Sequence, residues 1–301
     1  MAVRNNMKLS LSAIPFYWAK EKVIHFYEQI APSAVDDIYL GETVCAKRNE
    51  LSLEDWLAIG KNLQAAGKQV YLSSLALVCA NSDYKLIERV CNAGITVEAN
   101  DMSAVALLAR MQVPFVIGSS INIYNHLSLS VLLDKGLTRW VPPVEMSGQQ
   151  IKETLLELDK TQQARPEVEV FSYGWLPLAF SARCFSSRAK GVQKDNCQRN
   201  CLDDPEGLSV QTREKDQLFT LNGIQTLSGK KCNLLPLINT LADVGVDIVR
   251  VSPQLEGTLE VINAAQQALN GRFDSTETLS NLAEDECNGY WYGEPGLIVT
   301  G

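Results

Sequence analysis

Four cysteines supply the side chains in this sequence that most directly suggest chemistry. Three of them lie close together in the polar, basic stretch SARCFSSRAKGVQKDNCQRNC, namely Cys184, Cys197 and Cys201, and the fourth, Cys45, lies far upstream in GETVCAKRN. Thiolates bind iron–sulfur clusters and structural zinc, and either centre takes four of them. A flexible cationic loop is a poor place to bury a thiol, but it suits an anionic metal–thiolate centre. Five cations of this loop can offset the charge: Arg183, Arg188, Lys190, Lys194 and Arg199.

The spacing of these cysteines leaves the kind of metal open. It reads Cys-x12-Cys-x3-Cys with one remote partner. Zinc ribbons have Cys-x2-Cys pairs and bacterial ferredoxins have a tighter run, so neither generic pattern applies. The Cys-x3-Cys-x2-Cys run of radical-SAM enzymes is also absent from the sequence. From the residues alone, zinc and iron–sulfur are equally good predictions, and the alternative is a set of unrelated thiols.

The remaining cysteines are weaker candidates for ligands. Cys79 and Cys91 lie in apolar contexts, where a free cysteine is usually a core residue. Cys232 has no thiol nearby in the sequence. Cys287 lies in the aromatic segment DECNGYWYG, which can fold over a barrel mouth and bring this thiol near the metal centre. We therefore predict two core thiols, one isolated thiol and one neighbour of the site.

Other side chains that could act in catalysis are few in this sequence. The chain has only 2 histidines, which leaves little for serine–histidine or cysteine–histidine catalysis. Carboxylates near predicted strand ends permit paired-carboxylate hydrolysis, but structural hydrogen bonding around a barrel mouth is the stronger interpretation of each. These carboxylates are Glu42, Glu98, Glu145 and Glu169.

Composition and charge narrow the class of protein. The 301 residues are 46% hydrophobic and carry 27 Lys+Arg against 35 Asp+Glu, a net charge of −8. An acidic chain of this kind is not expected to bind nucleic acid. No stretch approaches the roughly 20 apolar residues of a membrane span, and no secretion signal is visible at the N-terminus. We therefore predict a cytoplasmic protein that is not integral to a membrane, in which thiols stay reduced.

Short β-rich runs alternate with amphipathic helical patterns along the chain. The predicted strands are Lys8–Ala13, Asp37–Leu40, Gln69–Leu75, Ile95–Ala99, Pro114–Gly118, Thr138–Pro142, Glu167–Tyr173 and Val246–Val251. The predicted helices are Ala19–Ile30, Leu53–Ala66, Asp83–Ala93, Met102–Met111, Leu127–Lys135, Gln149–Gln162, Leu235–Val244 and Gly257–Leu269. Ser52 is a predicted N-cap, with Asp55 at the capping-box position.

Eight strands alternating with helices predict a TIM-barrel-like (β/α)8 fold. A doubly wound open sheet has the same local pattern, but no Gly-x-Gly-x-x-Gly fingerprint follows an early strand. We predict one domain over residues 1–301, with a long insertion at 175–244 between the seventh and eighth strands. The insertion carries three of the cysteines and lies at the carboxyl-end face. Cys45 follows the second strand, so it should reach the same face.

The segment EVEVFSYGWLPLAFSARCF resembles the signature of the collagenase-like peptidase family of unassigned catalytic class. Glu169, Phe171 and Gly174 match its Glu-x-Phe-x-x-Gly core, and Cys184 matches a later signature cysteine. Pro177 stands where the first signature cysteine is expected. This departure argues against peptidase activity.

The chain is similar instead to the non-peptidase branch of this family that acts in ubiquinone biosynthesis without oxygen. The stretches that carry the similarity are YLGETVCAKR, LSSLALV, RWVPPVE, VFSYGWLPLAFSARCF, LNGIQT, DIVRVSPQ and CNGYW. The resemblance implies that Cys45, Cys184, Cys197 and Cys201 hold a 4Fe-4S cluster. It also implies a heterodimer with a UbiU-type cluster protein, an accessory lipid-binding protein as a further partner, and a polyprenylated ubiquinone precursor as substrate.

Two function classes follow from these observations. In the first, the chain is the redox subunit of an oxygen-independent (anaerobic) hydroxylase. Four cysteine ligands leave no open iron, so we predict electron transfer or a structural role for the cluster. In the second, the chain is a peptidase-type hydrolase with a structural metal centre.

Overall fold

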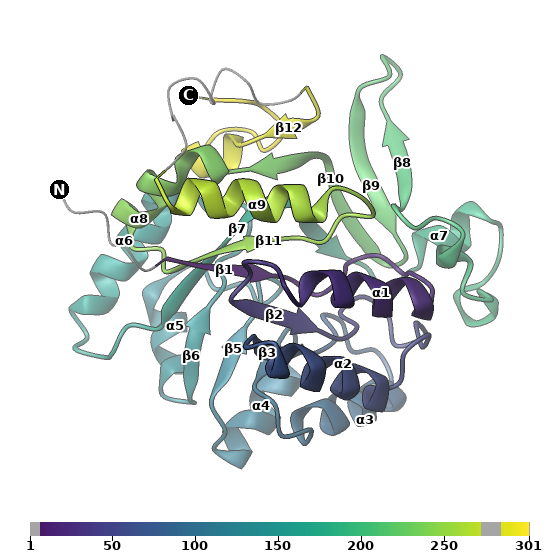
Figure 1. Ribbon diagram of the computed structural model, residues 1–301, viewed down its shortest axis with the longest axis horizontal. Coiled ribbons are helices and arrows are strands. Elements are labelled where there is room, and N and C mark those ends of the chain that lie inside the picture. The colour runs from purple at the N-terminus through teal and green to yellow at the C-terminus, as the bar shows by residue number, and fades with distance from the viewer. Residues whose placement is uncertain (1–6, 272–283, 301) are drawn as a thin grey trace.

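The centre of the computed structural model, which describes residues 7–271 and 284–300, is a closed barrel of parallel strands (Figure 1). Its eight strands are β1 (Lys8–Leu11), β2 (Asp37–Leu40), β3 (Gln69–Ser73), β4 (Val97–Ala99), β5 (Phe115–Ile117), β6 (Leu137–Trp140), β7 (Glu167–Phe180) and β11 (Ile248–Val251). Neighbouring strands pair in chain order from β1 to β7, and β11 closes the barrel by pairing with both β7 and β1. The predicted TIM-barrel fold is therefore confirmed, and the open doubly wound sheet is excluded.

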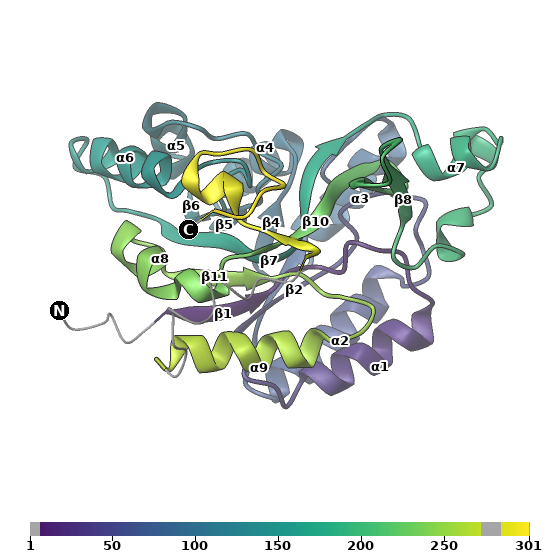
Figure 2. The same ribbon diagram turned by 90° about the horizontal axis from the view of Figure 1, so that it is seen from above.

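Helices follow the strands and cover the outside of the barrel. They are α1 (Lys20–Ile30), α2 (Leu53–Ala65), α3 (Asn81–Cys91), α4 (Met102–Met111), α5 (His126–Leu133), α6 (Gly148–Asp159), α8 (Ile238–Val244) and α9 (Thr258–Leu269). Figure 2 shows α1, α2 and α9 on one side of the barrel and α4, α5 and α6 on the opposite side. Their apolar inner faces join the strands in one continuous core. Of the helices in residues 7–271 and 284–300, none is long and apolar enough to span a membrane.

Helix α2 begins at the predicted capping box. The Asp55 N–H donates to Ser52 Oγ at 3.1 Å, and the Ser52 N–H donates to Asp55 Oδ2 at 2.9 Å. These two bonds satisfy backbone donors that the first helical turn leaves free. The prediction is confirmed, and the cap fixes where the loop after β2 enters its helix.

The insertion after β7 forms an antiparallel extension of the barrel sheet, visible beyond one end of the barrel in Figures 1 and 2. Strand β7 does not end at Tyr173 as predicted but continues to Phe180, because β10 pairs with its outer half. The register shifts around Leu227, the partner of Pro177, which has no N–H to donate. The other elements here are α7 (Phe185–Ala189), β8 (Leu208–Gln211), β9 (Gln217–Asn222) and β10 (Gln225–Asn233).

The chain between the extension and β11 also differs from the prediction. The single helix expected over Leu235–Val244 is a 3-10 turn, η3 (Leu235–Leu237), followed by α8. Leu237 has a non-helical ψ of 16° just after Pro236, which separates the two segments. Near the C-terminus, the short strand β12 (Glu286–Cys287) pairs parallel with β10.

Gly41 turns the chain out of β2 toward Cys45, and we expect its replacement to be costly. Its φ is +109°, and an added Cβ would lie 2.9 Å from the Ser73 backbone oxygen. Gly67 also has a positive φ, +86°, but an added Cβ there meets nothing within 4 Å. We expect Gly41→Ala to lower the free energy of unfolding by about 2–3 kcal/mol and Gly67→Ala by about 1 kcal/mol.

Urea unfolding of the two alanine variants measures this difference directly. Both replacements carry the strain of a positive φ. The additional loss of unfolding free energy in Gly41→Ala, compared with Gly67→Ala, therefore measures the clash with the Ser73 backbone oxygen. Equal losses in the two variants would contradict the expectation.

Candidate metal centre and barrel mouth

The fold brings the four predicted cysteines to one hollow. Cys45 lies in the loop after β2, and Cys184 is the N-cap residue of α7. Cys197 and Cys201 belong to two short 3-10 turns that follow, η1 (Lys194–Asn196) and η2 (Asn200–Leu202). All four thiols line the same hollow, together with Lys47, Arg48, Ser186, Ser187, Lys194, Arg199, Asn200 and Gly223. Two segments far apart in the sequence therefore meet here, as the barrel topology requires.

Hydrogen-bond donors surround the sulfur atoms. The Ser187 N–H donates to Cys184 Sγ at 3.4 Å. The Lys47 backbone N–H and the Arg48 guanidinium act in the same way on Cys45 and Cys201, since each lowers the pKa of its thiol. Donors of this kind favour the thiolate over the thiol. The hollow is thus prepared for negative charge on sulfur.

Two further donors of the hollow are buried without a partner in the described residues. They are Arg48 Nε and the Ser187 hydroxyl. An unpaired buried polar group is costly, so such a group commonly marks a site that a ligand or water completes. Both atoms belong to residues that line the hollow, where the sulfides of a cluster or the thiolates would accept from them.

Burial acts against ionisation of the free thiols. It raises the pKa of Cys45, with the Lys47 N–H opposing the rise, and it raises the pKa of Cys201, with Arg48 opposing it. Cys45 and Cys201 therefore hold their protons at neutral pH when no metal is bound. A metal that binds here must displace those protons, and its affinity then rises with pH.

Arg48 is the site residue that the sequence analysis missed. Its guanidinium is buried and donates to the Pro15 carbonyl at 2.9 Å and to Asn222 Oδ1 at 2.6 Å. It therefore ties the β1 loop, the β2 loop and the β9–β10 hairpin together beside Cys201. Its position three residues after Cys45 in the sequence was the available signal.

The predicted loop cations divide into two groups. Lys194 and Arg199 line the hollow, and Arg199 Nη1 also pairs with Glu50 Oε1 at 3.1 Å. Lys190 pairs instead with Asp203 at 2.6 Å, and Arg183 and Arg188 are exposed. Of the five loop cations predicted to offset the charge of the thiolates, only Lys194 and Arg199 therefore lie beside the cysteines.

Cys45 also borders a much larger cavity of about 750 Å³. This cavity lies among the loops after β2 and β3 and the helices α2 and α3. It shares Lys47, Arg48 and Lys194 with the hollow. Much of its wall is apolar and includes Val44, Leu51, Trp56, Leu75, Leu86 and Ile224. A long apolar ligand would thus lie next to the cysteines.

A network of buried charges fills the barrel interior. Glu169 is 0% exposed and accepts from Arg250 Nε at 2.7 Å and from Arg139 Nη1 at 3.2 Å. Burial alone would raise the pKa of Glu169, but attraction to the two arginines outweighs it and lowers the pKa to about 2. Arg139 also pairs with Asp37 at 2.7 Å, and Arg250 with Glu98 at 2.6 Å.

The carboxylates predicted near the strand ends therefore have different surroundings, and their contacts are structural hydrogen bonds and ion pairs. Glu98 and Glu169 are held by Arg250 in the interior network. Glu42 accepts the N–H groups of Val44 and Cys45, at 2.8 and 3.1 Å, so it shapes the cysteine loop. Glu145 accepts a hydrogen bond from the Tyr124 hydroxyl, so all four predicted carboxylates are structural hydrogen-bond acceptors.

The other four cysteines lie outside the hollow. Cys91 is buried at the end of α3 as predicted, but Cys79 is exposed, because its loop follows β3 instead of entering the core. Cys232 is not isolated: β10 and β12 pair Cys232 with Cys287 in register, and both are buried free thiols. The expectation that Cys287 approaches the metal centre is wrong, since it lines no part of the hollow.

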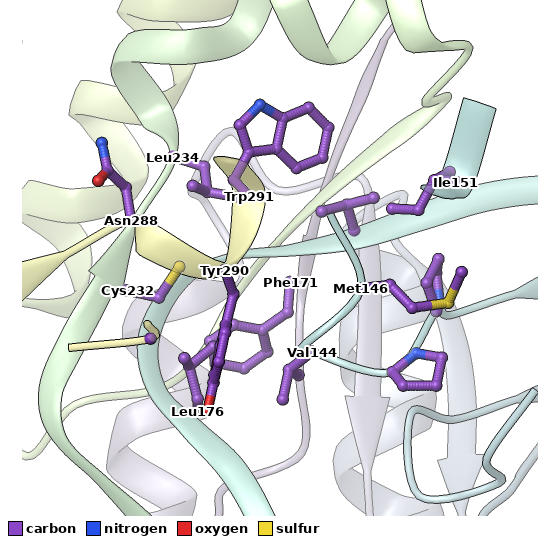
Figure 3. Close-up of a pocket in the computed structure, with 14 residues that line it drawn as sticks. Val144, Met146, Ile151, Phe171, Leu176, Cys232, Leu234, Asn288, Tyr290 and Trp291 are labelled. Atoms are coloured by element: carbon purple, nitrogen blue, oxygen red, sulfur yellow. The ribbon is translucent and has the colours of Figure 1, made fainter. Parts of the chain in front are cut away.

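The C-terminal aromatic segment closes a small apolar pocket instead. Figure 3 shows the Tyr290 ring beside Phe171 and Leu176, with the Trp291 ring turned the opposite way and Met146 across the pocket. The segment therefore packs on β7 and β10, on the barrel, and does not cover the cysteines.

Comparison with solved structures gives several similarities at low identity. The U32 peptidase Mk0906 has a TM-score of 0.46 and 9% identity, covering 83% of this chain and 94% of that one. Dihydropteroate synthase (FolP) from Thermus thermophilus has a TM-score of 0.40 and 13% identity, covering 90% and 94%. The tryptophan synthase alpha subunit from Campylobacter jejuni has a TM-score of 0.40 and 9% identity, covering 90% and 96%.

At the level of sequence, the match to a known family covers most of the chain. Residues 22–291 match Peptidase family U32. This span contains the four cysteines of the hollow and all the barrel strands except β1. The chain therefore belongs to peptidase family U32.

Proposed function

We propose that this chain is an iron–sulfur protein of the UbiV type, which acts with a UbiU-type partner in the oxygen-independent hydroxylation of the ubiquinone ring precursor. The observation that carries the proposal is the meeting of Cys45, Cys184, Cys197 and Cys201 at one hollow. The stretches of sequence that resemble the ubiquinone branch of peptidase family U32 lie along most of the chain. They therefore support the proposal beyond the four cysteines.

The residues of the hollow fit a 4Fe-4S cluster. Four thiols give the full ligand set, and the unpaired Arg48 Nε and Ser187 hydroxyl supply donors for sulfur. Lys47, Lys194 and Arg199 offset the negative charge of the thiolates. When bound, such a cluster supplies one-electron transfer. The chain itself holds the cluster, limits its contact with water and tunes it through N–H donors to sulfur.

The choice of a cluster over a single zinc ion rests on the resemblance to the ubiquinone branch, because four thiols are the full ligand set of either centre. Within residues 7–271 and 284–300, no three His, Cys, Asp or Glu side chains are arranged to hold one metal ion.

The cavity of about 750 Å³ supports a substrate with an apolar tail. It borders Cys45, and its partly apolar wall suits part of a polyprenyl chain. A tail bound here would keep the ring of the precursor close to the hollow and the barrel mouth. The accessory lipid-binding protein would then deliver the remainder of the tail.

A partner surface is supported by exposed apolar side chains. Leu127 and Val131 lie one turn apart on α5 and are 66% and 58% exposed. Large apolar side chains exposed together on one helix face commonly mark an interaction surface. We assign this face of α5 to the heterodimer with the UbiU-type protein.

A deletion strain tests the function in cells. We expect loss of the protein to lower ubiquinone only during anaerobic growth, with an unhydroxylated precursor accumulating. Cys45→Ala should fail to restore ubiquinone, because it removes the ligand that links the β2 loop to the insertion. Glu153→Gln, on the exposed face of α6 and outside both the hollow and the cavity, should restore it. Lipid extraction from cells grown with and without oxygen measures both outcomes.

The alternative is a peptidase-type hydrolase with a structural metal centre, which membership of peptidase family U32 favours. It predicts unchanged quinone and an accumulating peptide in the same strain. Pro177 at the position of the signature cysteine argues against it. Normal anaerobic ubiquinone in the deletion strain would reverse our preference.

A further inference from the structure

The mouth of the barrel holds a separate pocket of about 70 Å³. Its floor comes from residues at the carboxyl ends of barrel strands, and its upper wall comes from the extension formed by β7 and β10. The residues that matter here are Asn100, Phe171, Trp175, Phe180, Arg250 and Ser252. None of the four hollow cysteines lines it, so it is distinct from the candidate metal centre.

Arg250, which lines this pocket, has one hydrogen-bond donor without a partner among the described residues. Its Nε donates to Glu169 at 2.7 Å and its Nη1 to Glu98 at 2.6 Å. The residue is only 6% exposed, and its buried Nη2 has no acceptor among the residues that the structure describes. The two carboxylates hold the guanidinium fixed, so Nη2 is preorganised to bind an oxygen atom of a ligand.

The surrounding charge selects against an anionic ligand. Three buried carboxylates belong to the interior network, Asp37, Glu98 and Glu169, against the two guanidinium groups of Arg139 and Arg250. The network is therefore already negative without a ligand. A carboxylate placed at Nη2 would be repelled by this excess, whereas an uncharged oxygen would accept the hydrogen bond without that cost.

The apolar wall of the pocket suits a planar ring. Phe171, Trp175 and Phe180 all line it, and Trp175 is held by an edge contact with Phe16 at a centroid distance of 5.6 Å. Aromatic side chains bind a further ring in stacked or edge-on geometry. The pocket therefore combines aromatic side chains with a guanidinium group that is held in place by its two carboxylates.

We propose that the barrel mouth binds an uncharged, oxygen-bearing aromatic or quinonoid ring, whose oxygen accepts from Arg250 Nη2. The link between this ring and the hydroxylation substrate rests on the proposed function. Binding of the ring itself requires only the pocket, so it can be tested without the metal centre.

Isothermal titration of the anaerobically purified chain with 4-methoxyphenol and 4-methoxybenzoate tests the proposal. We expect 4-methoxyphenol to bind at least about tenfold more tightly than its carboxylate counterpart, because the second probe carries a buried charge. Arg250→Lys should weaken 4-methoxyphenol binding by about tenfold, because it removes a hydrogen bond from a charged donor. The matched control, Arg165→Lys, changes an exposed arginine that pairs with Asp159 and should bind like the wild type.

A second variant avoids disturbing the buried network. Ser119 lines the mouth and is partly exposed, so Ser119→Trp should fill the pocket and abolish binding while thermal unfolding stays unchanged. No binding of 4-methoxyphenol to the wild type, tighter binding of 4-methoxybenzoate, or normal binding to Ser119→Trp would each overturn the proposal.

Failure of this inference is separable from failure of the proposed function. A Cys184→Ala protein should bind 4-methoxyphenol like the wild type, because the thiol lies outside the pocket. If the protein binds the ring but never acquires iron, the cluster proposal is wrong and the pocket proposal holds. If it carries iron and sulfide but does not bind the ring, the pocket proposal is wrong and the cluster proposal holds.

Discussion

Purified without oxygen, the Cys184→Ala and Cys197→Ala proteins are expected to lack the broad visible absorption and the roughly four irons per chain of a Cys-ligated cubane, which the wild type should carry. Both thiols line the hollow, and loss of either leaves one iron without its ligand. Iron and sulfide analysis, with the electronic spectrum, measures the effect.

Cys79→Ala is the matched control for these variants. Its thiol is exposed and does not line the hollow, so the spectrum and the iron content should match the wild type. Stoichiometric zinc without sulfide in the wild-type protein would rule out the cluster, even if the cysteine variants lost that zinc.

Glu169→Gln is expected to lower the free energy of unfolding by about 3–5 kcal/mol, the usual effect of removing one partner from a buried ion pair. Glu169 is fully buried and compensates both Arg139 and Arg250. The neutral amide keeps the shape of the side chain but removes the carboxylate that both guanidinium groups share as their ion-pair partner. Urea unfolding at neutral pH measures the loss.

The pH dependence provides an independent check on the same residue. The folded pKa of Glu169 is about 2, below the value of about 4.3 expected in the unfolded chain. Its contribution to stability is therefore present above about pH 4.3 and is lost as the pH falls toward about 2. The acid-induced loss of stability across this window should be shallower in Glu169→Gln than in the wild type.

Glu153→Gln serves as the control, because Glu153 lies on the exposed face of α6 and accepts a hydrogen bond from the neighbouring Gln149. It should unfold within about 0.5 kcal/mol of the wild type. If Glu169→Gln unfolds at the same urea concentration as this control, the interior network does not stabilise the barrel as its geometry indicates.

The barrel could be predicted from the sequence because each of its units is local. A short apolar strand followed by an amphipathic helix is visible within about 30 residues, and the capping box at Ser52 is visible within four. Barrel closure did not follow from these units, because an open doubly wound sheet has the same local pattern. Closure was confirmed by the pairing of β11 with both β1 and β7.

The departures from prediction arise where the deciding partner is distant in sequence. Strand β7 runs to Phe180 because β10 pairs with it, and Cys232 lies beside Cys287 because β12 pairs with β10. Neither pairing leaves a local pattern. Cys79 ended an apolar run that resembled a core segment, but the chain leaves the barrel after β3 and exposes the thiol.

The residues of the candidate site were predicted from their type, cysteine, and not from the spacing between them. Cysteines in a basic loop are unusual enough to identify the hollow residues in advance. Arg48 was missed because a single arginine near a cysteine is common, and its role depends on contacts with Pro15 and Asn222. The pocket at the mouth was also invisible, since its donor is defined by two carboxylates from other strands.

The way in which the hollow is assembled sets the order of events during synthesis of the protein. Cys45 emerges from the ribosome long before Cys201, and the two segments meet only after β7 has turned into the insertion and the β9–β10 hairpin has bonded to Arg48. A nascent chain shorter than this has no complete ligand set. If the chain holds the proposed cluster, loading would therefore come late in maturation, and a carrier that donates iron and sulfide would have to recognise a barrel that has already folded.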